Sequence, residues 1–170
     1  MFVLGIDPGL SRCGYGLVRR DEAGPGTVVA VAAGVIETDP RRPVPERLET
    51  MQGELEALLS EVRPDTVVVE RLFFQVNART AISVGQVSGL ALAAAVRARC
   101  DVVEYTSNEV KQAVVGYGAA TKEQVQRMVA TVLGLDEDLR PPDVADALAL
   151  AVCHLATLPL RRAIDLAVDR

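Results

Sequence analysis

Four acidic residues border or interrupt apolar stretches of this chain, where a carboxylate is costly to bury unless something neutralises it. They are Asp7, Glu70, Asp143 and Asp146. No alternating Lys or Arg accompanies them in the sequence to form ion pairs. A bound divalent cation is the simplest neutralising partner, and hard oxygen ligands favour Mg²⁺ or Mn²⁺ over zinc. The pattern therefore points to metal-assisted chemistry.

The first two acids each end an apolar run that is typical of a buried strand. Asp7 follows residues 2–6, and Glu70 follows residues 66–69. These are the two most apolar strand-like runs, so we expect both strands to be central, adjacent and parallel. The carboxyl ends of parallel strands meet at one edge of a sheet, where α/β proteins bind their ligands. Asp7 and Glu70 should therefore lie side by side.

The other two acids share one face of a helix that we expect to begin at Pro142. Asp143 and Asp146 are three residues apart, and both should fall in the first turn, where the helix dipole favours negative charge. One helix end can therefore bring two carboxylates onto the strand ends. Four such carboxylates can hold two Mg²⁺ ions roughly 4 Å apart, one to generate hydroxide from water and one to stabilise a leaving 3′-oxygen.

Each acid also has an ordinary explanation when it is taken alone. Asp7 could be a turn residue, Glu70 a strand-end acid, and Asp143 an acid in the first turn of a helix. Asp146 is harder to explain in this way, because it is surrounded by apolar residues. The metal-binding interpretation depends on the set of four rather than on any one member.

Lysine usage provides a second candidate group. The chain has sixteen Arg and only two Lys, Lys111 and Lys122. A lysine ammonium is a compact point charge on a flexible stem, which suits tasks that a guanidinium does not. On these counts alone, chance and a specific role for the two lysines are equally open.

The distribution of apolar residues predicts an α/β fold with a five-stranded mixed sheet. Strands are expected at 2–7, 14–19, 27–36, 65–70 and 101–104. Helices are expected at 46–62 and 80–97, near 107 and 122, and from 142 onward. The first three strands should form an antiparallel meander with a hairpin loop at 21–26, and 71–77 should form a loop. Thr106 with Glu109 and Thr121 with Gln124 fit capping boxes, which place two helix starts.

Length and composition favour a cytoplasmic protein of one domain. The chain has 170 residues, three widely spaced Cys, and no apolar run near the roughly 18 residues of a membrane span. Its start lacks the basic region of a signal peptide. The net charge of −5 argues mildly against a nucleic-acid partner. Two divalent cations on the four acids would raise it to about −1, so local patches of charge are more informative.

Several motifs, in this order and at these spacings, resemble the RuvC family of Holliday-junction resolvases. They are Gly5-Ile6-Asp7-Pro8-Gly9 with Gly14-Tyr15-Gly16, Glu70-Arg71-Leu72-Phe73-Phe74 with Asn77, Gly85-Gln86, Val110-Lys111-Gln112-Ala113-Val114-Val115-Gly116, Thr121-Lys122-Glu123-Gln124-Val125, and Asp143-Val144-Ala145-Asp146-Ala147-Leu148-Ala149. The likeness extends from about Phe2 to about Leu158, which leaves 159–170 as a C-terminal tail after a single domain at 1–158.

The resemblance implies a ribonuclease-H-like fold flanked by helices and a homodimer that resolves four-way DNA junctions during recombination and repair. It implies Mg²⁺-dependent hydrolysis by paired symmetric nicks that leave 5′-phosphate and 3′-hydroxyl ends, with two Mg²⁺ per subunit and Mn²⁺ able to substitute. The family's metal-binding acids fall on Asp7, Glu70, Asp143 and Asp146. Its catalytic basic residues near the scissile phosphate fall on Lys111 and Lys122. Its partners are the junction-binding and branch-migration proteins RuvA and RuvB.

Residues outside the acidic set are candidates for DNA contacts. The family's junction-probing aromatic falls on Phe73, whose ring could stack on an unpaired base. Arg71 and Arg79 could contact phosphates, although a solvated surface explains them at least as well, and Asn77 could lie near the DNA, although an ordinary loop position is the favoured explanation. Arg12 is expected to be an ordinary loop residue, and His154 a packing residue rather than a ligand. The helix at 80–97, with Gly85 and Gly89 leaving one flank bare, is the candidate dimer interface.

Two other classes of function fit part of the sequence. A phosphotransferase of the actin and sugar-kinase type also places an Asp and a Gly after its first strand, but it needs two such lobes and a longer chain. A junction-binding module without nuclease activity would not need four converging acids. Loss of DNA cutting with retained junction binding in Asp7→Asn would separate the nuclease from both alternatives.

Overall fold

The computed structural model describes residues 1–21, 27–71, 78–135 and 139–168, with the side chains of 78–80 and 160–168 left aside. Five strands and five helices are formed by these residues. They are β1 Phe2–Asp7, β2 Arg12–Arg20, β3 Val28–Glu37, α1 Val44–Val62, β4 Thr66–Glu70, α2 Ala78–Arg97, β5 Asp101–Tyr105, α3 Ser107–Val115, α4 Lys122–Leu133 and α5 Pro142–Val168. The sequence places the start of each of them to within about two residues. The loops expected at 21–26 and 71–77 lie almost wholly outside the described residues.

The strands form one mixed sheet in the order β3-β2-β1-β4-β5. The β1–β2 and β2–β3 pairs are antiparallel, and the β1–β4 and β4–β5 pairs are parallel. The expected meander of the first three strands is therefore confirmed, as is the parallel pairing of the two most apolar strands. Because β1 is in the middle of the sheet with β4 beside it, their carboxyl ends meet at one edge.

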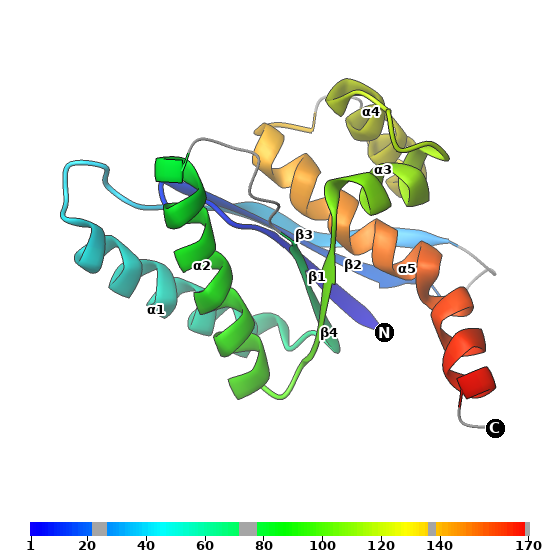
Figure 1. Cartoon of the computed structure of the whole chain (residues 1–170), viewed down its shortest axis with the longest axis horizontal. Helices are drawn as coiled ribbons and strands as arrows, with labels where there is room; N and C mark the ends of the chain where they lie inside the picture. The colour runs from blue at the N-terminus through cyan, green and yellow to red at the C-terminus, as the bar shows by residue number, and fades with distance from the viewer. Residues whose placement is uncertain (22–26, 72–77, 136–138, 169–170) are drawn as a thin grey trace.

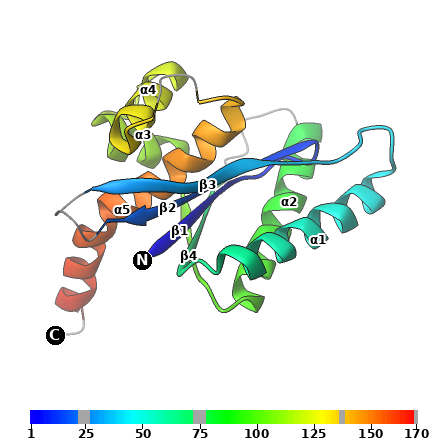
Figure 2. The same cartoon turned by 180° about the vertical axis from the view of Figure 1, so that it is seen from behind.

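Helices cover both faces of the sheet. Helices α1 and α2 lie on one face, and α3, α4 and α5 on the other (Figure 1). The rear view in Figure 2 shows the same two layers with the sheet between them. Strand β1 is buried on both sides: Val3 belongs to the core under α5, whereas Leu4 and Ile6 belong to the core under α1 and α2. This alternation follows from the two-residue period of a strand.

Helix α5 lies directly on the backbone of β1 and β2, because glycines remove the side chains from the contact. A Cβ atom built on Gly5 would lie 1.9 Å from the carbonyl oxygen of Ala147, and one on Gly14 would lie 2.2 Å from that of Asp143. Such distances are far below van der Waals contact, so only glycine permits this packing. The glycines thereby set the position of the first turns of α5 above the strand ends.

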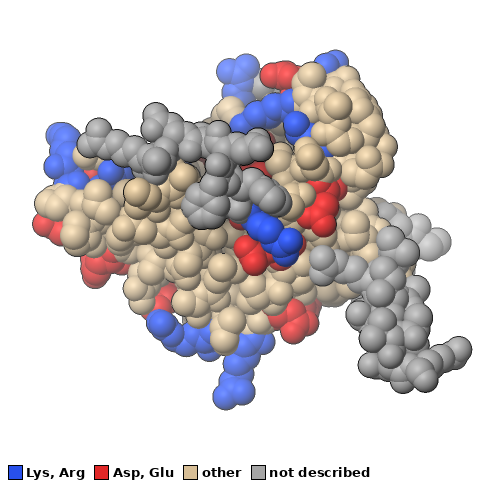
Figure 3. Space-filling view, viewed as in Figure 1, with Lys and Arg blue, Asp and Glu red and all other residues tan. Residues whose placement is uncertain are grey.

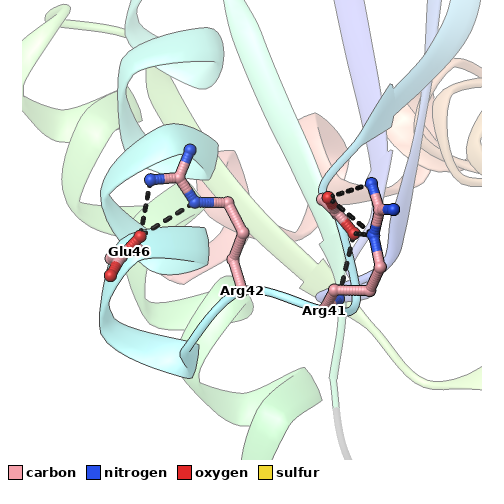
Figure 4. A network of polar contacts seen from close by, with 4 residues as sticks. Arg41, Arg42 and Glu46 are labelled. Atoms are coloured by element: carbon pink, nitrogen blue, oxygen red, sulfur yellow. Dashed lines mark hydrogen bonds and ion pairs between the residues drawn. The ribbon is translucent and has the colours of Figure 1, made fainter.

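Capping interactions fix the starts of α3 and α4. The Thr106 hydroxyl accepts the Glu109 N–H and the Glu109 carboxylate accepts the Thr106 N–H, and Thr121 with Gln124 makes the corresponding pair. Both predicted capping boxes are confirmed. Side-chain pairs also fix the approach to α1: Arg41 binds Asp39, and Arg42 binds Glu46 (Figure 4).

Three helices extend beyond their expected limits, and one of them, α2, does so only by beginning at Ala78 rather than 80. Helix α1 begins at Val44 rather than 46, because a proline is tolerated in the first turn, where its missing N–H has no helical partner. Helix α5 continues through Pro159 to Val168, so most of the expected C-terminal tail is helical. Within the described residues, none of the helices is both apolar enough and long enough to cross a membrane.

Candidate functional site

The two strand acids lie at the same edge of the sheet. Strands β1 and β4 are in parallel register, with Ile6 opposite Val69, and Asp7 and Glu70 each come next. Both strands are anchored in the apolar core up to these residues, and both acids are only partly exposed. The sheet therefore presents two neighbouring carboxylates at the carboxyl ends of adjacent parallel strands, as the sequence predicts.

Helix α5 adds the other two acids. Asp143 is in its first turn, and its backbone lies against Gly14 of β2. Asp146 comes one turn later, so the expectation that both acids occupy the first turn is wrong for Asp146. The helix dipole therefore favours the charge of Asp143 but contributes less at Asp146, because its effect falls off within the first turn.

A cavity of about 320 Å³ unites most of the predicted catalytic residues. Asp7, Glu70 and Asp146 line it, together with Lys111 of α3 and Lys122 of α4. Its remaining lining residues are Ser107, Val110, Val125, Ala149 and Leu150. Asp143 is not among the lining residues, but its charge reaches Asp7. Segments distant in the sequence thus meet at one cavity beside the strand ends.

Burial and mutual repulsion perturb the acids of this cavity. Burial, followed by the negative charges of Asp146, Glu70 and Asp143, raises the pKa of Asp7 to about 7 against the opposing charge of Lys122. Burial and the charge of Asp146 likewise raise the pKa of Glu70, although both lysines oppose this. Carboxylates perturbed in this way are poorly neutralised by the protein alone and are typical of functional sites.

Two basic residues pair with the acids of α5. Lys122 Nζ lies 2.5 Å from Asp146 Oδ2, and Arg12 Nε lies 3.0 Å from Asp143 Oδ2. Arg12 also binds Glu37 through Nη1 at 2.7 Å. The expectation that no Lys or Arg pairs with the acids is therefore wrong for α5. Arg12 is likewise no ordinary loop residue, because it begins β2 and joins two acids.

These ion pairs affect the geometry available to a metal ion. Among the side chains that the structure describes, no three of the His, Cys, Asp and Glu residues stand close enough together to hold a metal. Burial raises the pKa of Asp146 even though the hydrogen bond and charge of Lys122 lower it, so the lysine only partly satisfies this acid. The donor set consists of carboxylate oxygens with unmet charge, a chemistry that suits hard cations such as Mg²⁺ or Mn²⁺.

The other predicted DNA-contacting residues are only partly described. Arg71 is exposed directly after β4, and its backbone N–H donates to the carbonyl oxygen of Tyr105. Phe73 and Asn77 lie outside the described residues, as does the side chain of Arg79 at the start of α2. In Figure 3, acidic and basic side chains lie next to one another on this face, and neither sign covers it continuously.

Some residues near the site were not identified as site residues from the sequence. Arg12 is one, and Ser107, at the first position of α3, lines the cavity. The capping box at Thr106 locates the start of α3 but does not indicate that this start reaches the acids. His154 is buried, with Nδ1 3.1 Å from the Tyr105 hydroxyl, which is consistent with the predicted packing role.

A family model and curated proteins match most of this chain. A family model described as "Crossover junction endodeoxyribonuclease RuvC" matches residues 3–154. A curated RuvC of Syntrophomonas wolfei is 51% identical over 91% of this chain and 88% of its own length, and one of Moorella thermoacetica is 49% identical over 95% of both.

Solved structures agree with these relatives. Thermus thermophilus RuvC superposes with a TM-score of 0.86 at 38% identity, covering 94% of this chain and 96% of that one. A structure of the same protein in complex with a Holliday junction substrate gives 0.87 at the same identity and coverage. The yeast mitochondrial resolvase Ydc2 shares the fold, with a TM-score of 0.67 at 14% identity. The expected ribonuclease-H-like architecture is therefore confirmed.

Proposed function

The chain belongs to the RuvC family of crossover junction endodeoxyribonucleases, and on that premise we propose that it resolves Holliday junctions by paired symmetric nicks at the cavity beside β1 and β4. Hydrolysis would leave 5′-phosphate and 3′-hydroxyl ends. The observation that carries the proposal is the union of Asp7, Glu70, Asp146, Lys111 and Lys122 around one cavity. Such a site has ligands for cations and donors for a phosphate in one place.

Asp7, Glu70 and Asp146, with Asp143 beside them, are the proposed ligands of two Mg²⁺ per subunit, for which Mn²⁺ could substitute. When bound, the ions would supply Lewis-acid activation of water and charge neutralisation at the leaving oxygen. The protein's own contribution is to place partly buried carboxylates around one cavity. Burial and the neighbouring acids raise the pKa of Asp7, and this supports the proposal, because a bound cation would offset the unfavourable ionisation of this carboxyl group.

The two lysines are proposed to bind the scissile phosphate. Lys111 lies on α3 and Lys122 at the start of α4, and both line the cavity that the strand acids also line. Their ammonium groups would stabilise the negative charge that grows on the phosphate during hydrolysis. Phe73 is proposed to probe the junction by stacking on an unpaired base, and Arg71, Asn77 and Arg79 to contact the DNA backbone.

A homodimer is proposed because a four-way junction cut symmetrically needs two related active sites. Helix α2 offers the surface: its inner side packs against the core through Val87 and Ala91, while Ile82 and Val96 on its outer side are 64% and 66% exposed. Space around Gly89 is open on the same helix. RuvA and RuvB are the proposed partners for junction binding and branch migration.

Nicking of a synthetic four-way junction tests the function directly. We expect paired nicks with Mg²⁺, none with EDTA, and none on a linear duplex of the same sequence. Asp7→Asn should still bind the junction and should not cut it. Wild-type rates of cutting by Asp7→Asn would contradict the metal-ion proposal, and junction binding without any nicking by the natural chain would favour a binding module.

A further inference from the structure

The ion pair between Lys122 and Asp146 lies inside the proposed catalytic cavity. Lys122 is the first residue of α4, and its ammonium is 2.5 Å from Asp146 Oδ2. The two side chains are 57% and 28% exposed, so solvent reaches the pair and the lysine has room to move. An acid that is a proposed metal ligand is therefore already bound to a cation of the protein itself.

The backbone that carries Lys122 is held firmly. The Thr121 hydroxyl accepts the Gln124 N–H, and the Gln124 side-chain oxygen accepts both the Thr121 N–H at 2.8 Å and the Tyr117 hydroxyl at 2.7 Å. The start of α4 is thus held by the capping box and by the Tyr117 hydroxyl. Motion at this position belongs to the four-carbon side chain of the lysine rather than to the helix.

Lys122 is also the basic residue whose charge reaches most of the acids. It opposes the rise in pKa of Asp7, Glu70 and Asp146. Burial lowers its own pKa, but the hydrogen bond and charge of Asp146, with the charges of Asp7 and Asp143, raise that pKa overall. The ammonium of Lys122 thus interacts electrostatically with all four acids, as a divalent cation held by them would.

Arg12, the cation on Asp143, is placed differently. Its guanidinium binds Asp143 through Nε and Glu37 through Nη1, so it joins the end of β3 to the start of α5. A fork that spans two carboxylates keeps one partner when it loses the other. Of the two cations on the acids of α5, Lys122 is therefore the one that can leave its partner and move elsewhere.

We propose that Lys122 is an internal counter-ion that holds Asp146 in the metal-free enzyme, and that binding of the divalent cation displaces it from this carboxylate. The inference rests on the proposed function, because it takes Asp146 as a metal ligand. A carboxylate oxygen that already has an ammonium at 2.5 Å cannot hold a divalent ion without bringing two positive charges together. The displaced ammonium is then free to bind the scissile phosphate, so binding of the metal would also make the lysine available for catalysis.

Binding of Mn²⁺ to the full-length chain without DNA tests this coupling, with electron paramagnetic resonance as the readout rather than activity. Lys122→Met removes the competing charge, and we expect it to bind Mn²⁺ roughly three- to tenfold more tightly than the natural chain. Lys122→Arg keeps the charge and should stay within about twofold of it. Lys111→Met is the matched control: it removes a lysine from the same cavity, and its effect should be less than about twofold.

The thermal stability of the metal-free proteins provides a second readout. Lys122→Met should melt at a lower temperature than the natural chain, because Asp146 loses its counter-ion. Mn²⁺ should raise the melting temperature of Lys122→Met by more than it raises that of the natural chain. Lys122→Gln is measured in parallel, so that a folding defect of the Met variant does not decide the result.

The possible outcomes separate this inference from the proposed function. If Mn²⁺ binds the natural chain, and binds Lys122→Met and Lys122→Gln no more tightly, the counter-ion role is refuted while the metal site stands. If the natural chain does not bind Mn²⁺ at all, the proposed metal site fails and the inference fails with it. A gain in affinity for Lys111→Met as large as that for Lys122→Met would also refute it, because general charge would then be the cause.

Discussion

Asp7→Asn should stabilise the metal-free protein at neutral and alkaline pH while abolishing cleavage. Asp7 ends β1 inside the cavity, where burial and the charges of Asp146, Glu70 and Asp143 raise its pKa to about 7. A carboxyl group whose pKa is higher in the folded state binds its proton more tightly there than in the unfolded chain. Ionisation of this group therefore opposes folding, and the asparagine amide, which is neutral, does not.

The sign and size of the effect follow from the same pKa. A rise from the ordinary value of 3.8 to about 7 corresponds to about 4 kcal/mol of lost stability, at about 1.4 kcal/mol per pH unit. The loss begins as pH rises through 3.8, where the unfolded chain ionises, and is complete above 7. About 2 kcal/mol of it should develop between pH 5.5 and pH 8. Asp7 is partly exposed, so solvent screening places the expected gain of Asp7→Asn at roughly 2–4 kcal/mol at pH 8.

Urea unfolding in EDTA at pH 5.5 and pH 8 measures this gain. Glu49→Gln is the control, since it removes one negative charge from an exposed position of α1 far from the cavity. The stability advantage of Asp7→Asn should grow with pH, whereas that of Glu49→Gln should stay near zero. Saturating Mg²⁺ should reduce the stability difference between Asp7→Asn and the natural chain, because the ion stabilises only the natural chain, which retains the Asp7 carboxylate. An Asp7→Asn protein that is less stable than the natural chain at pH 8 would refute the electrostatic account.

Three further predictions concern the chemistry, the packing and the DNA. Lys111→Ala and Lys122→Ala should each slow cleavage of a bound junction by about 100-fold while weakening junction binding by only a few fold; equal losses in both assays would argue against a role at the scissile phosphate. Gly14→Ala should lower the free energy of unfolding by about 2–3 kcal/mol in urea denaturation, because its Cβ would meet the carbonyl oxygen of Asp143. Gly53→Ala is the control: this glycine faces open space on α1, so the alanine should raise the free energy of unfolding by about 0.5–1 kcal/mol. Phe73→Ala should impair cutting of intact junctions more than of pre-nicked ones, which already expose bases, and identical losses on both substrates would contradict a stacking role.

The sheet could be predicted from the sequence because its signals are local. Residues 2–6 and 67–69 are apolar without interruption, which is typical of strands buried on both faces, and such strands lie at the centre of a sheet. The capping boxes at Thr106 and Thr121 place helix starts through contacts three residues apart. Proline was the weaker guide: Pro45 lies within the first turn of α1, and Pro159 lies within α5.

The sequence predicts that the four acids lie near one another, but it does not predict which basic residues pair with them. The adjacency of Asp7 and Glu70 follows from strand order, and the shared face of Asp143 and Asp146 follows from helical spacing. The contact of Arg12 with Asp143 joins residues 131 positions apart and depends on how α5 lies across β2. No periodicity encodes such a contact. It is set by glycines that let the helix approach, and the effect of a glycine depends on what packs against it.

The pairing pattern divides the four acids into two kinds with different roles in assembly of the site. Asp143 and Asp146 lie on α5, and each pairs with a basic residue of another element, Arg12 of β2 or Lys122 of α4, which reduces the repulsion of placing it near the strand ends. Asp7 and Glu70 cannot move, because β1 and β4 are held in register on both faces by the core. The fixed acids have no basic partner of their own in the described residues, and burial is the first cause of their raised pKa values, as it is for Asp146. A cation would be attracted to the rigid pair, and Asp146 would complete its coordination by exchanging Lys122 for the ion while Arg12 stays on Asp143. The fold would thus assemble four carboxylates before a metal arrives without leaving all of them unpaired.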